Sequence, residues 1–410
     1  MARKCNSAKT KKIKRVGKSD SKITVYSFFS CSGFLDLGFE LVKGRPYQLR
    51  MANEPNEKFC QCYKYAREHL AKPIDVPDDF IFKNSVEDFL LENGKPQEGK
   101  EKIYARFTDL LNKDRKANKL IGFIGGPPCP DFSVAGRNLG KDGKVGPLSS
   151  KYIELICQEC PDFFLFENVR GLYSSAKHRE YFDYICGKLR HLYAIDVKVL
   201  NALWYGVPQS RERLIMIGVR KDLVSNMTDA SFERMLHWSK FQSFDKEKLK
   251  NVVWPKREPF TGKRDVDWPD GYDYIKPLTV LHCWTESNVE KHPNHQNQTK
   301  PRPGNTKFMT IPEGNAKGKS YQRLHRFRYA PTAAYGNNEV PLHPWEPRRI
   351  SIAEALATQS LPPDFSFPTD MGISALFKAV GNGVPYKMAS GLAQMIYKFL
   401  LKNVLEVTNE

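Results

Sequence analysis

The chain has 410 residues, enough for two or three domains with hydrophobic cores of their own. Its 64 lysine and arginine residues outnumber 46 acidic residues, and the net charge of +18 favours a polyanionic partner. No apolar run approaches the ~20 residues that a membrane-spanning helix needs, so we expect no membrane protein.

A basic tail precedes the first predicted strand. Residues 1–22 contain nine basic side chains and one acidic side chain, so we expect a flexible segment here. A buried strand follows at residues 23–29, then a turn rich in Ser, Cys and Gly and a helix that continues to Val42. Further strands are predicted at residues 47–52, 80–82, 119–124 and 163–166, with helices between several of them, for example over residues 149–159 and 178–192.

This alternation of strands and helices is typical of an α/β protein with a doubly wound, mostly parallel sheet. Residues 194–202 and 214–219 predict an antiparallel hairpin at the edge of that sheet. We therefore expect a catalytic and cofactor-binding domain at residues 23–220, completed by residues 370–410. Its last helix, at about residues 386–404, is expected to pack back on the sheet.

The composition changes near residue 221. From there to about residue 347, many Pro, Asn, His, Trp and basic residues occur with little periodicity, which predicts a smaller, loop-rich domain over residues 221–369. Ser351 and Glu354 have the spacing of a capping box, so a helix is expected over residues 351–359. Cys157-x-x-Cys160 has no second pair at zinc-ribbon spacing, and we predict no metal site.

Unusual residues follow several predicted strands. In doubly wound sheets, ligands bind beyond the carboxyl ends of the strands, which is where Gly33, Glu54 and Glu167 occur. The spacing from Gly33 to Glu54 suits a glycine turn near a nucleotide-like ligand and an acid on its ribose hydroxyls. Because Gly-x-Gly-x-x-Gly is absent, a nucleoside without pyrophosphate fits better than a dinucleotide.

The run Gly-Gly-Pro-Pro-Cys-Pro at residues 125–130 is the most specific signal. Its glycines and prolines predict a rigid turn that presents the Cys129 thiol at the end of a strand. Such a thiol is a candidate nucleophile. Residues 132–148 follow with several glycines and are expected to form a mobile lid over the substrate.

In order and spacing, Cys129, Glu167 and the run Gln209-x-Arg211-x-Arg213 resemble the motifs of the DNA (cytosine-5) methyltransferases. The resemblance extends over nearly all of residues 23–400 and points to a prokaryotic restriction-modification type of enzyme. Further segments that resemble family motifs are residues 29–40 (FSCSGFLDLGFE), 53–55, 348–365 and 378–385 (KAVGNGVP).

The resemblance implies a Rossmann-like, S-adenosylmethionine-dependent fold with target recognition at residues 221–369. It implies an enzyme that transfers a methyl group from S-adenosylmethionine to C5 of a flipped-out cytosine in a specific duplex DNA sequence. Cys129 would bond to C6, and Glu167 would hold or protonate N3. Arg213 would lie near the cytosine O2 and Arg211 near the flanking DNA backbone.

The same resemblance assigns binding residues. Cofactor contacts are expected from Phe29, Gly33, Leu35, Glu54, Asn84, Pro128, Leu148, Asn382 and Val384. DNA contacts are expected from Ser133, from Gln209 and, in the recognition domain, from Arg323, Arg326 and Arg328.

The chain departs from the family pattern at several positions. Cys31 and Phe34 occupy positions where glycines are usual, which predicts a tighter or shifted turn. Asn84 stands where an aspartate is usual, and Gly383 stands where alanine or serine is common. None of these changes removes a catalytic group, but they could alter cofactor affinity.

Two alternatives share the same motifs: a cytosine-5 methyltransferase that acts on transfer RNA, and an inactive DNA-binding regulator on the same fold. The large basic second domain favours duplex DNA, and the intact Cys129, Glu167, Arg211 and Arg213 favour an enzyme. We further expect a cytoplasmic monomer, with a cognate restriction endonuclease that acts on the same site.

Overall fold

The computed structural model describes residues 23–128, 146–174, 176–224, 227–299, 306–318, 320–333, 335 and 339–405. The basic tail and the predicted site residues Cys129 and Ser133 lie outside these ranges.

A seven-stranded sheet forms the centre of the described structure, with the strand order β3-β2-β1-β6-β7-β9-β8. The first five strands in this order are parallel, whereas β9 runs antiparallel to both β7 and β8. The predicted doubly wound sheet and its antiparallel edge hairpin are therefore confirmed. The strands are β1 (Ile23–Phe28), β2 (Tyr47–Asn53), β3 (Ile81–Phe82), β6 (Ile121–Gly125), β7 (Phe163–Val169), β8 (Tyr193–Asn201) and β9 (Glu212–Arg220).

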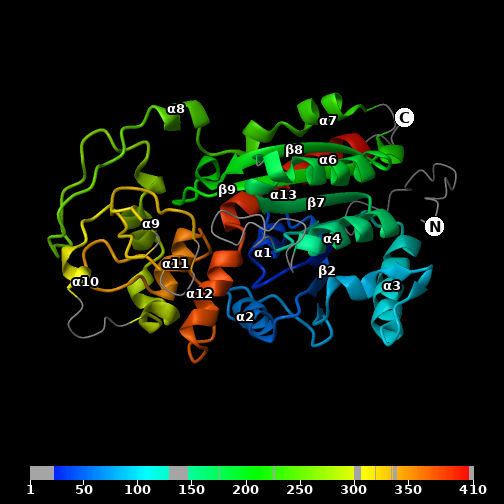
Figure 1. The fold of residues 1–410 in the computed structure, drawn as a ribbon, viewed down its shortest axis with the longest axis horizontal. Coiled ribbons are helices and arrows are strands. Elements are labelled where there is room, and N and C mark those ends of the chain that lie inside the picture. The colour runs from blue at the N-terminus through cyan, green and yellow to red at the C-terminus, as the bar shows by residue number, and fades with distance from the viewer. Residues whose placement is uncertain are drawn as a thin grey trace.

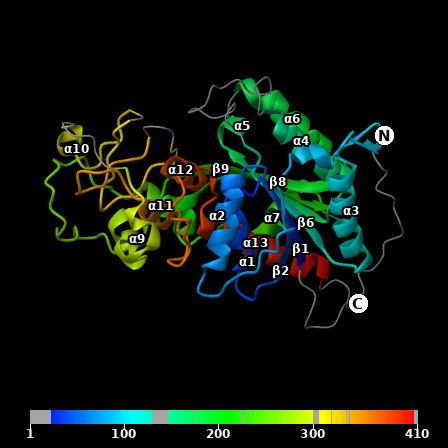
Figure 2. The same cartoon turned by 90° about the horizontal axis from the view of Figure 1, so that it is seen from below.

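Helices cover both faces of the sheet, which is why its central strands read as nearly continuous apolar runs. On β1, Ile23 and Val25 point into a core shared with α1 (Phe34–Glu40) and α13 (Tyr386–Leu400). Tyr26 and Phe28 point to the opposite face, into a core shared with α3 (Glu101–Lys116), α4 (Gly146–Glu159) and α6 (Ala176–Arg190). Figure 2 shows the sheet between these two layers.

The remaining elements are short. The other helices are α2 (Glu57–Glu68), α5 (Gly171–Ser174), α7 (Asp229–Leu236), α8 (Lys246–Lys250), α9 (Val280–Glu286), α10 (Lys307–Thr310), α11 (Ile352–Thr358) and α12 (Ile373–Asn382), and β4 (Leu91–Glu92) pairs with β5 (Lys95–Pro96). Short helical turns are η1 (Val86–Phe89), η3 (Ala202–Tyr205), η4 (Lys221–Leu223), η5 (Trp238–Phe241), η6 (Lys276–Leu278), η7 (Val289–Lys291), η8 (Pro293–Gln296) and η9 (Leu401–Leu405).

The loop-rich region lies to one side of the sheet and contains α9, α10 and α11 (Figure 1). Buried arginine side chains connect its loops. The Arg323 guanidinium donates to the carbonyls of Phe308, Ile311, His343 and Glu346. We call Arg323 and Arg326, whose contacts are given below, the arginine cross-links, because they hold backbone segments that have little secondary structure.

The hydrophobic core of the sheet includes residues beyond position 220, where the predicted catalytic domain was interrupted. Phe232 and Trp238 belong to the same core as Val219 and Phe399, so the sheet domain continues through α7 and η5. The expected helix near residue 351 is confirmed as α11, whose N-cap Ser351 forms a capping box with Glu354.

Among the described helices, none is both long and apolar enough to cross a membrane. The described residues also contain no group of three or more His, Cys, Asp or Glu side chains placed to hold a metal ion.

Candidate active site

Most of the predicted site residues lie at one edge of the sheet. The carboxyl ends of β3, β2, β1, β6 and β7 meet there, together with the beginning of β9, because β9 runs in the opposite direction. In this order the edge carries Asn84, Glu54, Phe29, Pro128, Glu167 and Arg213.

Glu167 and Arg213 form an ion pair at this edge. Strand pairing places Arg213 opposite Val169, two residues beyond Glu167, and the Arg213 Nε lies 3.0 Å from the Glu167 Oε1. The Arg213 side chain is 12% exposed and the Glu167 side chain is 10% exposed. Burial raises the pKa of Glu167, although the charges of Arg213 and Arg211 oppose this shift. The site thus contains a carboxyl group that binds a proton more readily than an exposed glutamate does.

The beginning of the cysteine loop lies directly against Glu167. A Cβ atom on Gly126 would lie 2.7 Å from the Glu167 Oε2, so a larger residue here would require the Glu167 carboxyl group to shift. The Asn168 Nδ2 donates to the Pro127 carbonyl at 3.4 Å. Pro128 is the last described residue of the loop and is exposed.

The turn between β1 and α1 keeps a glycine-like backbone. Cys31 has a φ of 49° and Gly33 has a φ of 76°, both in the left-handed region. The Cys31 residue therefore adopts the conformation for which glycine is best suited. At Gly33 a Cβ would also meet Arg67 at 2.4 Å and Tyr63 at 2.6 Å.

Glu54 is held by this turn in a way that suits a nucleoside. Its Oε2 accepts from the Cys31 backbone N–H at 3.0 Å, and its Oε1 accepts from the Asn56 N–H at 2.8 Å. Burial raises the pKa of Glu54. The two backbone bonds fix the carboxylate, and each oxygen retains a lone pair that can accept from a ribose hydroxyl.

Other expected cofactor residues divide into two groups. Phe29, Asn84 and Leu148 are half-buried around the same edge, and the Asn84 Nδ2 donates to the Ser85 carbonyl, so its oxygen is oriented away from that bond. Leu35 and Val384 are 6% and 5% exposed and belong to the sheet core. Both residues therefore present little surface to a cofactor, whereas Asn382 is exposed.

Gln209 and Arg211 point into the protein. The Arg211 side chain is buried, and its guanidinium donates to the carbonyls of Ala333, Gly381 and Gly383 at 3.0, 2.8 and 3.0 Å. The Gln209 Oε1 accepts from the Ala333 N–H at 3.2 Å. These contacts argue against the expected DNA contacts of both residues.

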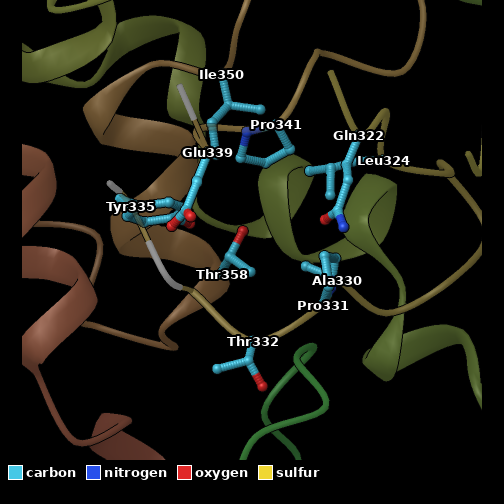
Figure 3. A pocket seen from close by; sticks show the side chains of 10 residues that line it. All are labelled: Gln322, Leu324, Ala330, Pro331, Thr332, Tyr335, Glu339, Pro341, Ile350 and Thr358. Atoms are coloured by element: carbon cyan, nitrogen blue, oxygen red, sulfur yellow. The ribbon is translucent and has the colours of Figure 1, made fainter. Parts of the chain in front are cut away.

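The segment that these two side chains hold, residues 330–333, borders a small cavity of about 10 Å³ (Figure 3). The space is on the scale of one water molecule. Ala330 and Thr332 line it from the segment, and Thr358 lines it from α11. Thr332 is anchored by a bond from its hydroxyl to the Ser210 carbonyl at 2.7 Å.

The structure corrects the prediction for two recognition-domain arginines. Arg323 and Arg326 are 2% and 3% exposed, so neither presents its guanidinium to DNA. Arg326 forms a bidentate pair with Glu313 at 2.9 Å and donates to the Arg264 carbonyl. Arg328 is half-buried over the Tyr329 ring and stays a predicted DNA contact.

We expect Arg323→Ala to lower the free energy of unfolding by more than about 2 kcal/mol, because several buried carbonyls lose their donor. Arg328→Ala should change stability by less than ~1 kcal/mol and weaken DNA binding. Thermal unfolding and fluorescence anisotropy with duplex DNA at fixed salt would separate the two effects. An Arg323→Ala protein of normal stability with lost DNA affinity would contradict the buried position.

Sequence reasoning marked some of the residues that shape this site but not their contacts. Gly126 belongs to the Gly-Gly-Pro-Pro-Cys-Pro run and Asn168 follows Glu167, so the motifs indicated where both residues lie. The contacts of Arg211 with the carbonyls of Gly381 and Gly383 carried no such signal, because they join segments 170 residues apart or more.

Comparison with known proteins agrees with the geometry. Residues 99–398 match the family model of the C-5 cytosine-specific DNA methylases. The chain belongs to this family. As a C-5 cytosine-specific DNA methylase, it transfers a methyl group to C5 of cytosine in DNA, and the family implies S-adenosylmethionine as the methyl donor.

Relatives span almost the whole methylase chain. It is 45% identical to the type II methyltransferase M.NmeDI of Neisseria meningitidis serogroup C over 94% of this chain and 86% of that protein. It is 27% identical to the type II methyltransferase M.MthTI of Methanothermobacter thermautotrophicus over 92% of this chain and 97% of that protein. A crystal structure of Spodoptera frugiperda DNMT2 has a TM-score of 0.54 at 15% identity, covers 92% of this chain and 100% of its own, and shows the shared fold.

Proposed function

We propose that this methylase acts on a cytosine flipped out of duplex DNA, through a covalent bond between the Cys129 Sγ and the cytosine C6. A stacked cytosine does not expose C6, so the base must leave the helix before the thiolate can reach it. Formation of the S–C6 bond pushes electron density to C5. When bound, S-adenosylmethionine supplies the methyl group there; loss of the C5 proton and cleavage of the S–C6 bond then restore the ring and the free thiolate.

The Glu167–Arg213 pair is the observation that carries this proposal. A carboxyl group with a raised pKa can share a proton with the cytosine N3, which makes C6 more electrophilic. The Arg213 guanidinium, 3.0 Å from this carboxyl, would lie near the cytosine O2 and offset negative charge on the ring. Gly126, three residues before Cys129, also lies close to the Glu167 carboxyl group.

The turn at residues 29–33 and Glu54 would hold the cofactor. The Glu54 carboxylate, fixed by the backbone of Cys31 and Asn56, would accept from the ribose hydroxyls. The Asn84 amide oxygen would accept from the adenine amino group, in place of the aspartate usual in the family.

We further propose that the protein is the modification component of a restriction-modification pair, a cytoplasmic monomer that shares its site with a restriction endonuclease. The name type II methyltransferase, carried by the relatives above, supports this role. The net charge of +18 supports binding to duplex DNA.

Incubation with methyl-labelled S-adenosylmethionine would test the substrate. We expect the label in duplex DNA as 5-methylcytosine, and bisulfite sequencing of DNA from expressing cells should show one recurring sequence. Label in RNA alone would favour the transfer RNA alternative. The absence of label from all nucleic acids would favour the inactive regulator.

A further inference from the structure

We infer that Arg211 is a positioning residue that couples the cofactor side of the site to the recognition domain through residues 381–384. We call these residues the bridging loop; they are the last two residues of α12 and the two residues that follow it. The inference rests on the proposed function, because it assigns the cofactor to the turn at residues 29–33 and to Glu54, and the target base to the Glu167–Arg213 pair.

Arg211 joins the bridging loop to the recognition domain. One guanidinium nitrogen donates to the Ala333 carbonyl, and the other donates to the carbonyls of Gly381 and Gly383. The Arg211 Nε is buried with no hydrogen-bond partner within the described structure. A buried cation is costly unless polar groups surround it, so these carbonyls fix where the guanidinium can lie.

Phe34 joins the same loop to the cofactor side. A Cβ atom on Gly383 would lie 2.1 Å from a ring carbon of Phe34, so the ring fills the space that a larger residue at position 383 would need. The ring is itself held by Phe365 and Phe367, at centroid distances of 5.4 and 6.1 Å. The two departures from the family pattern, Phe34 and Gly383, are therefore complementary in size.

The turn that carries the cofactor residues contacts the helix leading into this loop as well. The Cys31 thiol and the Ser32 hydroxyl lie 3.8 and 3.5 Å from the Ala379 carbonyl in α12. Cys31 also donates its backbone N–H to Glu54. A ligand that orders this turn would therefore also order the end of α12, from which the bridging loop continues.

On the recognition side, the bridge ends at residues 330–333. This segment is held by Gln209, Ser210 and Arg211, and three of its residues, 330–332, line a small cavity. A shift of the bridging loop would move the Arg211 guanidinium, and the guanidinium would in turn move the Ala333 carbonyl to which it is bonded. Because coupling is reciprocal, DNA should raise cofactor affinity by the same factor as the cofactor raises DNA affinity.

Calorimetry can measure the dissociation constant of S-adenosylhomocysteine with and without duplex DNA that contains the methylated sequence. For the unaltered protein we expect DNA to tighten binding by about 5-fold or more. Arg211→Met should reduce this factor to about 1 while the cofactor still binds in the absence of DNA. Gly383→Ala should weaken S-adenosylhomocysteine binding and reduce the factor, because of the clash with Phe34.

The chain offers a matched control and a rescue. Gly381→Ala adds the same methyl group to the same loop, but its Cβ would have ordinary contacts of 3.5 Å or more, so the coupling should be unchanged. Gly383→Ala combined with Phe34→Leu should recover the coupling because the smaller side chain leaves room. Thermal unfolding of each variant checks that it is folded.

The inference is overturned if the unaltered protein shows no coupling, or if Arg211→Met keeps it. It is also overturned if Gly383→Ala behaves like Gly381→Ala, or if a folded double variant shows no recovery. Failure of the proposed function would instead appear earlier, as absent methylation by the unaltered protein in the experiment that identifies the target sequence.

Discussion

Glu167→Gln is expected to slow methyl transfer by about 10²- to 10⁴-fold, the range that a positioned proton donor contributes. The glutamine keeps the shape of the side chain beside Gly126, but its amide N–H can only donate a hydrogen bond and is too weakly acidic to transfer a proton to the cytosine N3. Single-turnover methylation with labelled cofactor measures the chemical step directly. Glu212→Gln is a matched control, because Glu212 lies on the same edge of the sheet and pairs with the exposed Arg170.

The rate of methyl transfer should also depend on pH through the protonation of Glu167. If the protonated Glu167 is the active form, the contribution of this group to the rate falls as the pH rises through the pKa of the carboxyl, which gives the falling limb of the pH profile. Burial raises that pKa, and the Arg213 charge lowers it, so Arg213→Leu should move the falling limb to higher pH. A Glu167→Gln rate within tenfold of normal, or a limb that moves to lower pH, would contradict the assigned role.

Cys129→Ser is expected to reduce methyl transfer by at least about 10⁴-fold, the scale reached when a covalent nucleophile is removed. A serine hydroxyl is a much weaker nucleophile than a thiolate and would not add to C6. DNA binding should largely remain, because phosphate contacts supply most of the affinity. Filter binding and single-turnover methylation measure the two quantities.

DNA with 5-fluorocytosine at the target tests the covalent bond itself. Fluorine at C5 is not lost as a proton is, so the S–C6 bond persists and the protein should stay attached to DNA after denaturation. Cys129→Ser should form no adduct. Cys157→Ser replaces a free, half-buried cysteine in α4 and should form it normally. An adduct with Cys129→Ser would show that another residue attacks the base.

Periodicity and turn chemistry predicted most of the sheet. The strand at residues 163–169 and the antiparallel strand at residues 212–220 were recognisable as apolar runs, and their pairing brings Glu167 close to Arg213. The helix α11 was recognisable because a capping box is local in sequence. Elements whose signal lies within a few residues were therefore predicted well.

The arginines of the recognition domain show what sequence alone does not reveal. Arg323 and Arg326 stand among aromatic and basic residues, a pattern that also suits a DNA-binding surface. Their side chains instead turn inward to carbonyls and to Glu313, which are brought near only by the folded loops. Phe34 and Gly383 give the same lesson, because each departure from the family pattern is explained only by the other.

The arginine cross-links have a consequence for how new target specificities can arise. Arg323 binds main-chain oxygens, and every amino acid supplies one, so the loops it holds can exchange their outward side chains without losing their anchor. Variation of exposed loop positions with Arg323 and Arg326 retained should therefore give folded enzymes far more often than variation that includes them. The buried arginines thus hold the loop backbones in place while the exposed side chains, and with them the recognised DNA sequence, can change during evolution.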